Sequence, residues 1–241
     1  MTVIDVRFAA PTGGAGPDQD EEWCEVTRHG STERIRFHDY AAIFAVPGLY
    51  ERIFHDLLEC CSPRVVADLL AEVLPDPGAA RVLELGAGNG LVGAELRRIG
   101  VRHLAAVDIL PEAAAAAERD RPGTYDAYHL MDLTRDDTTP LGTPDVLVTV
   151  AALGFGDIPP EAFAAAFRRL RPGGLVAFTI KEEFLGSQDR SGFADLIART
   201  DGLTTLAERR YVHRRTMYGA PLHYVARIAR RQPAGPETAR R

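Results

Sequence analysis

Hydrophobic and polar positions alternate with a period of two at the start of the chain and with a helical period after it. Val3 to Phe8 alternates like a β-strand, and residues 23–28 and 33–37 flank a His-Gly-Ser turn in a pattern typical of a small hairpin. From Phe37 the apolar residues recur every three or four positions, which predicts two or three helices. Residues 11–20, rich in glycine and proline, predict a loop.

Further along, short apolar runs alternate with amphipathic ones, as they do in repeated βα units. We expect one strand that starts at Val82 and four more over residues 103–108, 125–133, 144–150 and 175–180. Helices are expected over residues 91–99, 111–121, 160–170 and 191–199, and two long alternating strands over 203–214 and 222–230. This order predicts an α/β domain built around a sheet.

Composition narrows the function classes. The chain has 241 residues, of which 46% are hydrophobic and 26% charged, and its formal net charge is −6. Its overall field therefore repels nucleic acids and anionic membranes. No signal segment opens the chain, and no apolar run reaches membrane-spanning length. We expect a cytoplasmic protein whose partners include neither nucleic acid nor membrane.

The three cysteines, Cys24, Cys60 and Cys61, lack the spacing that is typical of metal ligands. We therefore expect no metal site. Adjacent Cys60 and Cys61 are expected to pack as small apolar residues on a helix.

The most informative stretch is the glycine loop, Glu84-x-Gly86-x-Gly88-x-Gly90, which follows an apolar strand and precedes an amphipathic helix. Glycines accept positive φ and, lacking Cβ, let a ligand lie directly against the backbone. A dinucleotide fingerprint would need its third glycine at position 91, where Leu91 stands. A nicotinamide-dependent oxidoreductase is therefore only a minor alternative.

Three further marks follow the glycine loop. Asp108 ends the next strand, 22 residues after Gly86, close to the spacing of about 20 expected of a carboxylate that accepts ribose hydroxyls. Asp132 and Leu133 end the third strand, and Leu-Arg-Pro-Gly-Gly at 170–174 turns into the fifth. The glycine loop and these three features follow one another between residues 82 and 180. In this order they resemble the sequence motifs of the class I S-adenosylmethionine (SAM) methyltransferases.

The resemblance covers roughly residues 37–231 and implies a three-layer Rossmann-like fold. It implies a seven-stranded sheet in the order 3-2-1-4-5-7-6, whose last hairpin is antiparallel, and an N-terminal helical lid. We divide the chain into a β-like extension and loop (1–36), the lid (37–78), a SAM-binding core (79–231) and a tail (232–241). The extension is either an appended β element that mediates a homodimer or a wandering arm.

The resemblance also implies a cofactor, SAM, with S-adenosylhomocysteine (SAH) as its product. In this family the acid after the third strand accepts the adenine amino group, and the next backbone N–H meets the ring. The expected cofactor-binding residues are Tyr40, Glu84, Gly86, Ala87, Gly88, Asn89, Asp108, Ile109, Asp132, Leu133 and Val150.

Methyl transfer from a sulfonium requires mainly alignment and desolvation, so a catalytic side chain is not obligatory. A hydroxyl or carboxyl acceptor can still use a base, and His38 and His213 are the candidates.

The loop after the fourth strand, Val150-Ala151-Ala152-Leu153, lacks the Asn/Asp-Pro-Pro-aromatic tetrad of DNA and amide N-methyltransferases. It also lacks the acidic cluster of metal-dependent enzymes. We expect a metal-independent methyltransferase with a small-molecule or peptide acceptor; a SAM-binding regulatory or assembly protein without transferase activity is the alternative.

Overall fold

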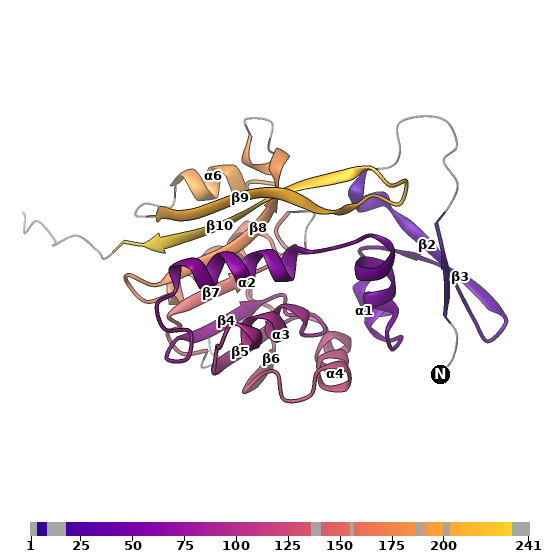
Figure 1. The fold of residues 1–241 in the computed structure, drawn as a ribbon, viewed down its shortest axis with the longest axis horizontal. Coiled ribbons are helices and arrows are strands. Elements are labelled where there is room, and N and C mark those ends of the chain that lie inside the picture. The colour runs from indigo at the N-terminus through magenta and orange to yellow at the C-terminus, as the bar shows by residue number, and fades with distance from the viewer. Residues whose placement is uncertain are drawn as a thin grey trace, which may run out of the picture.

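The computed structural model describes residues 4–8, 18–135, 141–154, 157–186, 189, 191–199 and 203–232. The loop expected at 11–20 and the tail expected at 232–241 lie mostly outside these residues. Within them, no helix is long and apolar enough to cross a membrane. Two sheets, of three and seven strands, organise the described chain (Figure 1).

The larger sheet has the strand order β6-β5-β4-β7-β8-β10-β9. Its strands are β4 (Arg81–Leu85), β5 (His103–Asp108), β6 (Ala127–Leu130), β7 (Val146–Thr149), β8 (Leu175–Lys181), β9 (Leu203–Arg215) and β10 (Pro221–Arg231). The first five pair in parallel, whereas β10 is antiparallel to both β8 and β9. Renumbered from β4, this is the expected order 3-2-1-4-5-7-6, and the Rossmann-like methyltransferase fold is confirmed.

Helices cover both faces of this sheet because successive side chains of a buried strand point to opposite sides. Val82 of β4 packs in one core cluster with Leu70 of α2 (Ser62–Val73) and Leu96 of α3 (Leu91–Arg98). Its neighbour Leu83 packs in the other cluster with Phe163 of α5 (Pro160–Arg169). The same domain contains α4 (Pro111–Asp120) and α6 (Phe193–Arg199).

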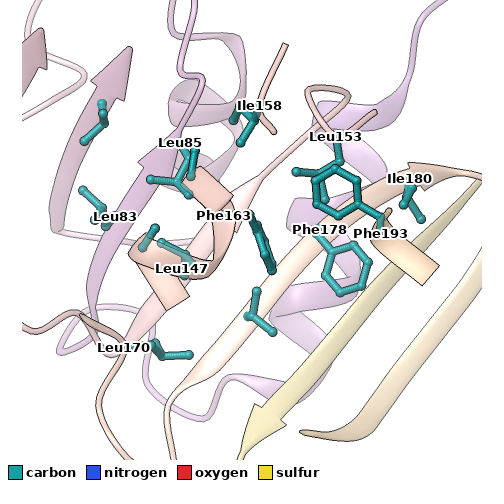
Figure 2. Packing of buried hydrophobic residues seen from close by; sticks show 14 of the residues in the cluster. Leu83, Leu85, Leu147, Leu153, Ile158, Phe163, Leu170, Phe178, Ile180 and Phe193 are labelled. Atoms are coloured by element: carbon teal, nitrogen blue, oxygen red, sulfur yellow. The ribbon is translucent and has the colours of Figure 1, made fainter. Parts of the chain in front are cut away.

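Three phenylalanines lie among the aliphatic side chains of the second cluster (Figure 2). The ring of Phe163 lies edge-on to Phe178 of β8, with 6.2 Å between ring centroids, and edge-on to Phe193 of α6, at 6.0 Å. These edge-to-face contacts are favourable because the positive ring edge meets the negative ring face. They anchor α5 and α6 on the sheet.

The smaller sheet is formed by the N-terminal extension. Strands β1 (Asp5–Arg7), β2 (Trp23–Arg28) and β3 (Ser31–Arg36) are antiparallel, and a short 3₁₀ turn, η1 (Gln19–Glu21), precedes β2. The hairpin turn places His29 and Gly30 at φ 51° and 79°. Two positive φ values in a two-residue loop suit the right-handed twist of the paired strands.

The lid follows the extension and contains α1 (Tyr40–Phe44) and a π-helical segment, η2 (Glu51–Leu57). Cys60 and Cys61 lie in the connection between η2 and α2, so their expected placement on a helix is wrong. Helix α2 begins at Ser62, and Cys61 occupies its N-cap position. The hydroxyl of Ser62 is hydrogen-bonded to His213 and Tyr211 of β9.

A buried ion pair joins the extension to the terminal hairpin. Arg214 of β9 donates from Nη2 to Oε2 of Glu22 at 2.6 Å, and the two side chains are only 3% and 0% exposed. The second oxygen of Glu22 accepts the backbone N–H of Met217 at 2.6 Å. Because both carboxylate oxygens have donors, the desolvated charge is compensated.

We predict that Arg214→Met, which leaves Glu22 buried without its cation, lowers the free energy of unfolding by about 3 to 5 kcal/mol. The adjacent Arg215 supplies a matched control because its pair with Glu59 is exposed on both sides. Arg215→Met should cost less than about 1 kcal/mol. Urea denaturation measures both, and equal losses in the two variants would contradict the structural role given to the buried pair.

Candidate functional site

A cavity of about 420 Å³ lies at the carboxyl ends of the parallel strands. Ligands of open α/β sheets bind at this edge, outside the strand ends. Residues that follow β4, β5, β6 and β7 line one side of the cavity, and the lid residues His38, Tyr40, Phe44 and Tyr50 line the other. The site is therefore a chamber between the sheet edge and the lid.

The glycine loop forms the floor of this cavity. Gly86, Gly88 and Gly90 have φ values of 65°, 54° and 85°, all in the left-handed region. A Cβ on Gly86 would lie 3.1 Å from the Ile158 side chain, and one on Gly88 would lie 3.0 Å from the Phe44 ring. Both the backbone conformation and the available space therefore require glycine at these two positions.

Three consecutive N–H groups of the loop are hydrogen-bonded within the protein. Gly86 and Ala87 donate to the Val107 carbonyl of β5 at 2.9 and 3.2 Å, and Gly88 donates to Oδ2 of Asp108 at 2.9 Å. Phosphate-binding loops instead direct their free N–H groups at the anion. These three groups are therefore not available to an anion, which suits a cofactor without a pyrophosphate.

Asp108 ends β5 and lines the cavity. Its two carboxylate oxygens accept the backbone N–H groups of Gly88 and Leu110, each at 2.9 Å. Burial raises the pKa of this carboxyl, and these hydrogen bonds oppose the rise. Each oxygen keeps further lone pairs, so the oriented carboxylate can still accept ligand hydroxyls.

Other expected cofactor residues surround the same cavity. Asp132 and Leu133 line it beyond the end of β6, and Oδ1 of Asp132 accepts the N–H of Thr134 at 2.9 Å. The hydrogen bonds from Thr134 lower the pKa of Asp132. Ile109 lies at the cavity wall with 59% of its surface exposed. Ala87, Asn89, Val150 and Tyr40 are also lining residues.

Glu84 is placed differently from the other expected cofactor residues. It is buried inside β4, is not among the residues that line the cavity, and accepts the Tyr125 hydroxyl at 2.9 Å. Tyr125 in turn packs against Gly93 of α3. The structure therefore gives Glu84 a supporting position beneath the glycine loop, because its side chain points to the face of the sheet that α2 and α3 cover.

The two candidate bases are in different environments. His38 lines the main cavity, and its Nδ1 lies 3.3 Å from Oδ1 of Asp157. His213 is fully buried behind the lid, where its Nδ1 is hydrogen-bonded to the Ser62 hydroxyl at 2.6 Å. Burial and the neighbouring Arg214 lower the pKa of His213 well below its usual value. His213 is therefore neutral, and it is not among the residues that line the main cavity.

Asp157 was not singled out by the sequence. It lies in the loop after β7, 119 positions from His38, and lines the same cavity. An isolated aspartate in a loop carries no local pattern that would mark it as a partner of a distant histidine. Only the folded arrangement of lid and sheet edge brings the two side chains together.

Polar contacts attach the lid to the cofactor loop. The side chain of Asn89 donates to Oε1 of Glu51 in η2 at 2.8 Å. Arg121, just after α4, donates to the same oxygen at 2.8 Å and to the Asn89 carbonyl at 3.1 Å. The lid therefore closes on the residues that are expected to hold the cofactor.

Fold and site together define a Rossmann-like α/β protein that binds a nucleoside cofactor at its sheet edge. A family model described as a methyltransferase domain matches residues 59–216. The chain therefore belongs to this methyltransferase domain family, and its cofactor is SAM.

Curated relatives and solved structures agree with this assignment. The chain is 36% identical over 122 residues to human methyltransferase-like protein 27, which is 50% of this chain and 49% of that protein. It is 32% identical over 106 residues to a SAM-dependent Diels-Alderase of Talaromyces variabilis, 42% of this chain and 36% of that one. The matches thus span about half of the human relative and about a third of the fungal one.

Two solved structures show the same fold. The N-methyltransferase NodS of Bradyrhizobium japonicum WM9, in complex with SAH, matches with a TM-score of 0.59 and 17% identity, over 81% of this chain and 97% of that one. The [4+2]-cyclase SpnF matches with a TM-score of 0.54 and 18% identity, over 72% of this chain and 81% of that one.

We predict that Asp108→Ala weakens SAH binding about tenfold to a hundredfold, because hydrogen bonds to a charged group contribute about 1.5 to 3 kcal/mol. Asp68→Ala, on the outer face of α2, is the control and should leave the affinity unchanged. Isothermal titration measures both. An unaltered affinity in Asp108→Ala would show that this carboxylate does not contact the cofactor.

A second prediction concerns pH. Burial raises the pKa of Glu84 from 4.5 to about 8, so folding takes up a proton between these values. The contribution of this group to stability is complete below the lower value and is lost as pH rises through the higher one. The side chain of Glu84→Gln is neutral at every pH. Its free energy of unfolding should therefore rise relative to that of the wild type by about 1 kcal/mol per pH unit in this window. Urea denaturation between about pH 5 and pH 8 tests this; parallel curves would contradict it.

Proposed function

We propose that this protein transfers a methyl group from SAM to a small-molecule nucleophile without a metal ion. The observation that carries the proposal is the cavity, which is lined by the glycine loop, Asp108, His38 and aromatic residues of the lid. Within the described chain, no group of three or more His, Cys, Asp or Glu residues could hold a metal. In this proposal the chain's own side chains align and activate the acceptor.

The residues fit the cofactor in size and chemistry. The left-handed glycines leave room that any Cβ would fill, and Asp108 offers oriented carboxylate oxygens to ribose hydroxyls. Asp132 and Leu133 line the same cavity, and in this proposal they contact the adenine. Bound SAM supplies an electrophilic methyl group on a good leaving group. The protein contributes orientation and exclusion of water, for which the lid provides the cover.

His38 is the general base in this proposal when the acceptor carries a proton. Asp157 contacts Nδ1 of His38, so a proton on that nitrogen would be bonded to the carboxylate and Nε2 would be the basic atom. A proton taken from the acceptor makes an imidazolium, which the adjacent carboxylate stabilises. Asp157 is therefore the positioning residue and His38 the catalytic one.

Location and assembly belong to the same proposal. The three cysteines, all among the described residues, are free thiols, which fits a reducing cytoplasm. Strand β3 is an edge of the small sheet and is paired only with β2 among the described strands, so its other side is open to a second copy. On this basis we propose that the extension mediates a homodimer.

Acceptor screening tests the enzyme against its alternative. The protein is incubated with SAM and a panel of uncharged phenols, amines and short peptides, and SAH release is measured. We expect acceptor-dependent SAH release from at least one class of small molecule. Binding of SAM without any acceptor-dependent release would contradict the proposal and would favour a SAM-binding protein without transferase activity.

With an acceptor found in this way, we predict that His38→Ala lowers kcat about a hundredfold or more, since a positioned base contributes about 10²- to 10⁴-fold. SAH affinity should not change. His103→Ala, at the exposed start of β5, is the matched control and should keep full turnover. Full turnover in His38→Ala would instead support catalysis by alignment alone.

A further inference from the structure

A second, smaller cavity adjoins the proposed acceptor region. Its volume is about 30 Å³, enough for a single water or one small polar group. It shares six lining residues with the main cavity: His38, Tyr40, Tyr50, Cys60, Ala151 and Asp157. We call it the niche. Since His38 and Asp157 stand between the two spaces, the niche is the inner end of the acceptor site.

The N-terminal extension supplies part of the niche wall. Gln19 of η1 and Phe37, just after β3, line it together with Tyr224 of the terminal hairpin. Gln19 is only 7% exposed although it lies on a short 3₁₀ turn. The family model starts at residue 59, so Gln19 lies outside the segment that defines the family.

Gln19 has an unused hydrogen-bonding position. Its Nε2 donates to the Tyr224 hydroxyl at 2.8 Å, whereas its Oε1 is buried and has no hydrogen-bond partner among the described residues. A buried amide oxygen without a partner costs about 1 to 3 kcal/mol. Turning the carboxamide over would leave the amino end unpaired instead. In either orientation, one end of Gln19 can bond to a further polar group, from a water molecule or from a ligand.

The charges around the two cavities limit what that ligand can be. Asp39, Asp108, Asp132 and Asp157 line the main cavity. The guanidinium at the niche, that of Arg214, is already paired with the buried Glu22. Among the described residues that line the niche, no cation is left over to compensate an acidic ligand. The Asp157 carboxylate at the niche is in turn within 3.3 Å of Nδ1 of His38, so a cationic ligand finds no carboxylate there without a partner.

The geometry points to Gln19 as the residue that selects an acceptor carrying an uncharged hydroxyl group on a planar ring. A hydroxyl both donates and accepts, so it satisfies either end of the carboxamide. The niche has room for the hydroxyl alone, so the ring would lie in the main cavity, where Tyr40 and Tyr50, which line both spaces, offer flat apolar faces. This inference rests on the proposed function, and it makes the extension a wall of the acceptor site.

The probes are phenol, benzoate and benzylamine, which are similar in size and are neutral, anionic and cationic. Each is titrated into SAH-saturated protein and into the free protein, and binding is followed by NMR. We expect phenol to bind more tightly than the other two and to shift the side-chain amide resonances of Gln19 in the wild-type protein. Binding of benzoate or benzylamine as tight as that of phenol would overturn the inference.

Substitution gives the second readout. Gln19→Met keeps the length of the side chain and removes its hydrogen bonds, so phenol affinity should fall about three- to tenfold. SAH affinity should stay the same. Glu21→Met, at an exposed position of the same 3₁₀ turn, should leave both affinities unchanged. Equal phenol affinity in both variants would overturn the inference.

The wild-type spectra keep the test decisive if Gln19→Met does not fold. Phenol that leaves the Gln19 amide resonances unmoved would mean that the niche holds only a water molecule. Failure of SAH itself to bind would overturn the proposed function, and the titration of the free protein with phenol would still decide the role of Gln19. The two failures are therefore distinguishable.

Discussion

The whole site depends on how the backbone reverses between β4 and α3. The reversal is tight because Gly86 and Ala87 both donate to the Val107 carbonyl of the neighbouring strand, and Gly88 donates to Asp108. These bonds fix the loop against β5 and orient the Asp108 carboxylate at the same time. They also engage three N–H groups that would otherwise be available to a phosphate. One set of hydrogen bonds thus sets the shape of the floor, the position of the acid and the kind of cofactor that fits.

The upper half of the site is assembled from segments that are distant in sequence. The extension, the lid and the terminal hairpin meet around the buried pair of Glu22 and Arg214. This pair costs desolvation energy, which two further backbone contacts offset: Glu22 accepts the Met217 N–H, and Arg214 donates to the Arg215 carbonyl. Its position next to Gln19 and Tyr224 explains how the N-terminal extension comes to border the niche.

The order of the seven strands could be predicted because each βα unit has a clear period and because the glycine loop fixes where the first unit starts. Local spacing also placed Asp108 and the residues that follow β6 at one edge. Contacts between distant segments could not be predicted in this way: Asp157 beside His38, Gln19 beside Tyr224 and Tyr125 beneath the loop have no local signal. Glu84 was grouped with the cofactor residues by its position in the motif, whereas strand alternation turns its side chain toward Tyr125.

The loop and Asp108 together form a site that suits a sulfonium nucleoside better than a dinucleotide. Isothermal titration of the purified protein with SAM, SAH and NAD distinguishes the two. We expect both sulfur nucleosides to bind and NAD not to bind, because Leu91 stands where the dinucleotide fingerprint requires its third glycine. Binding of NAD alone, or of none of the three, would show that this assignment is wrong.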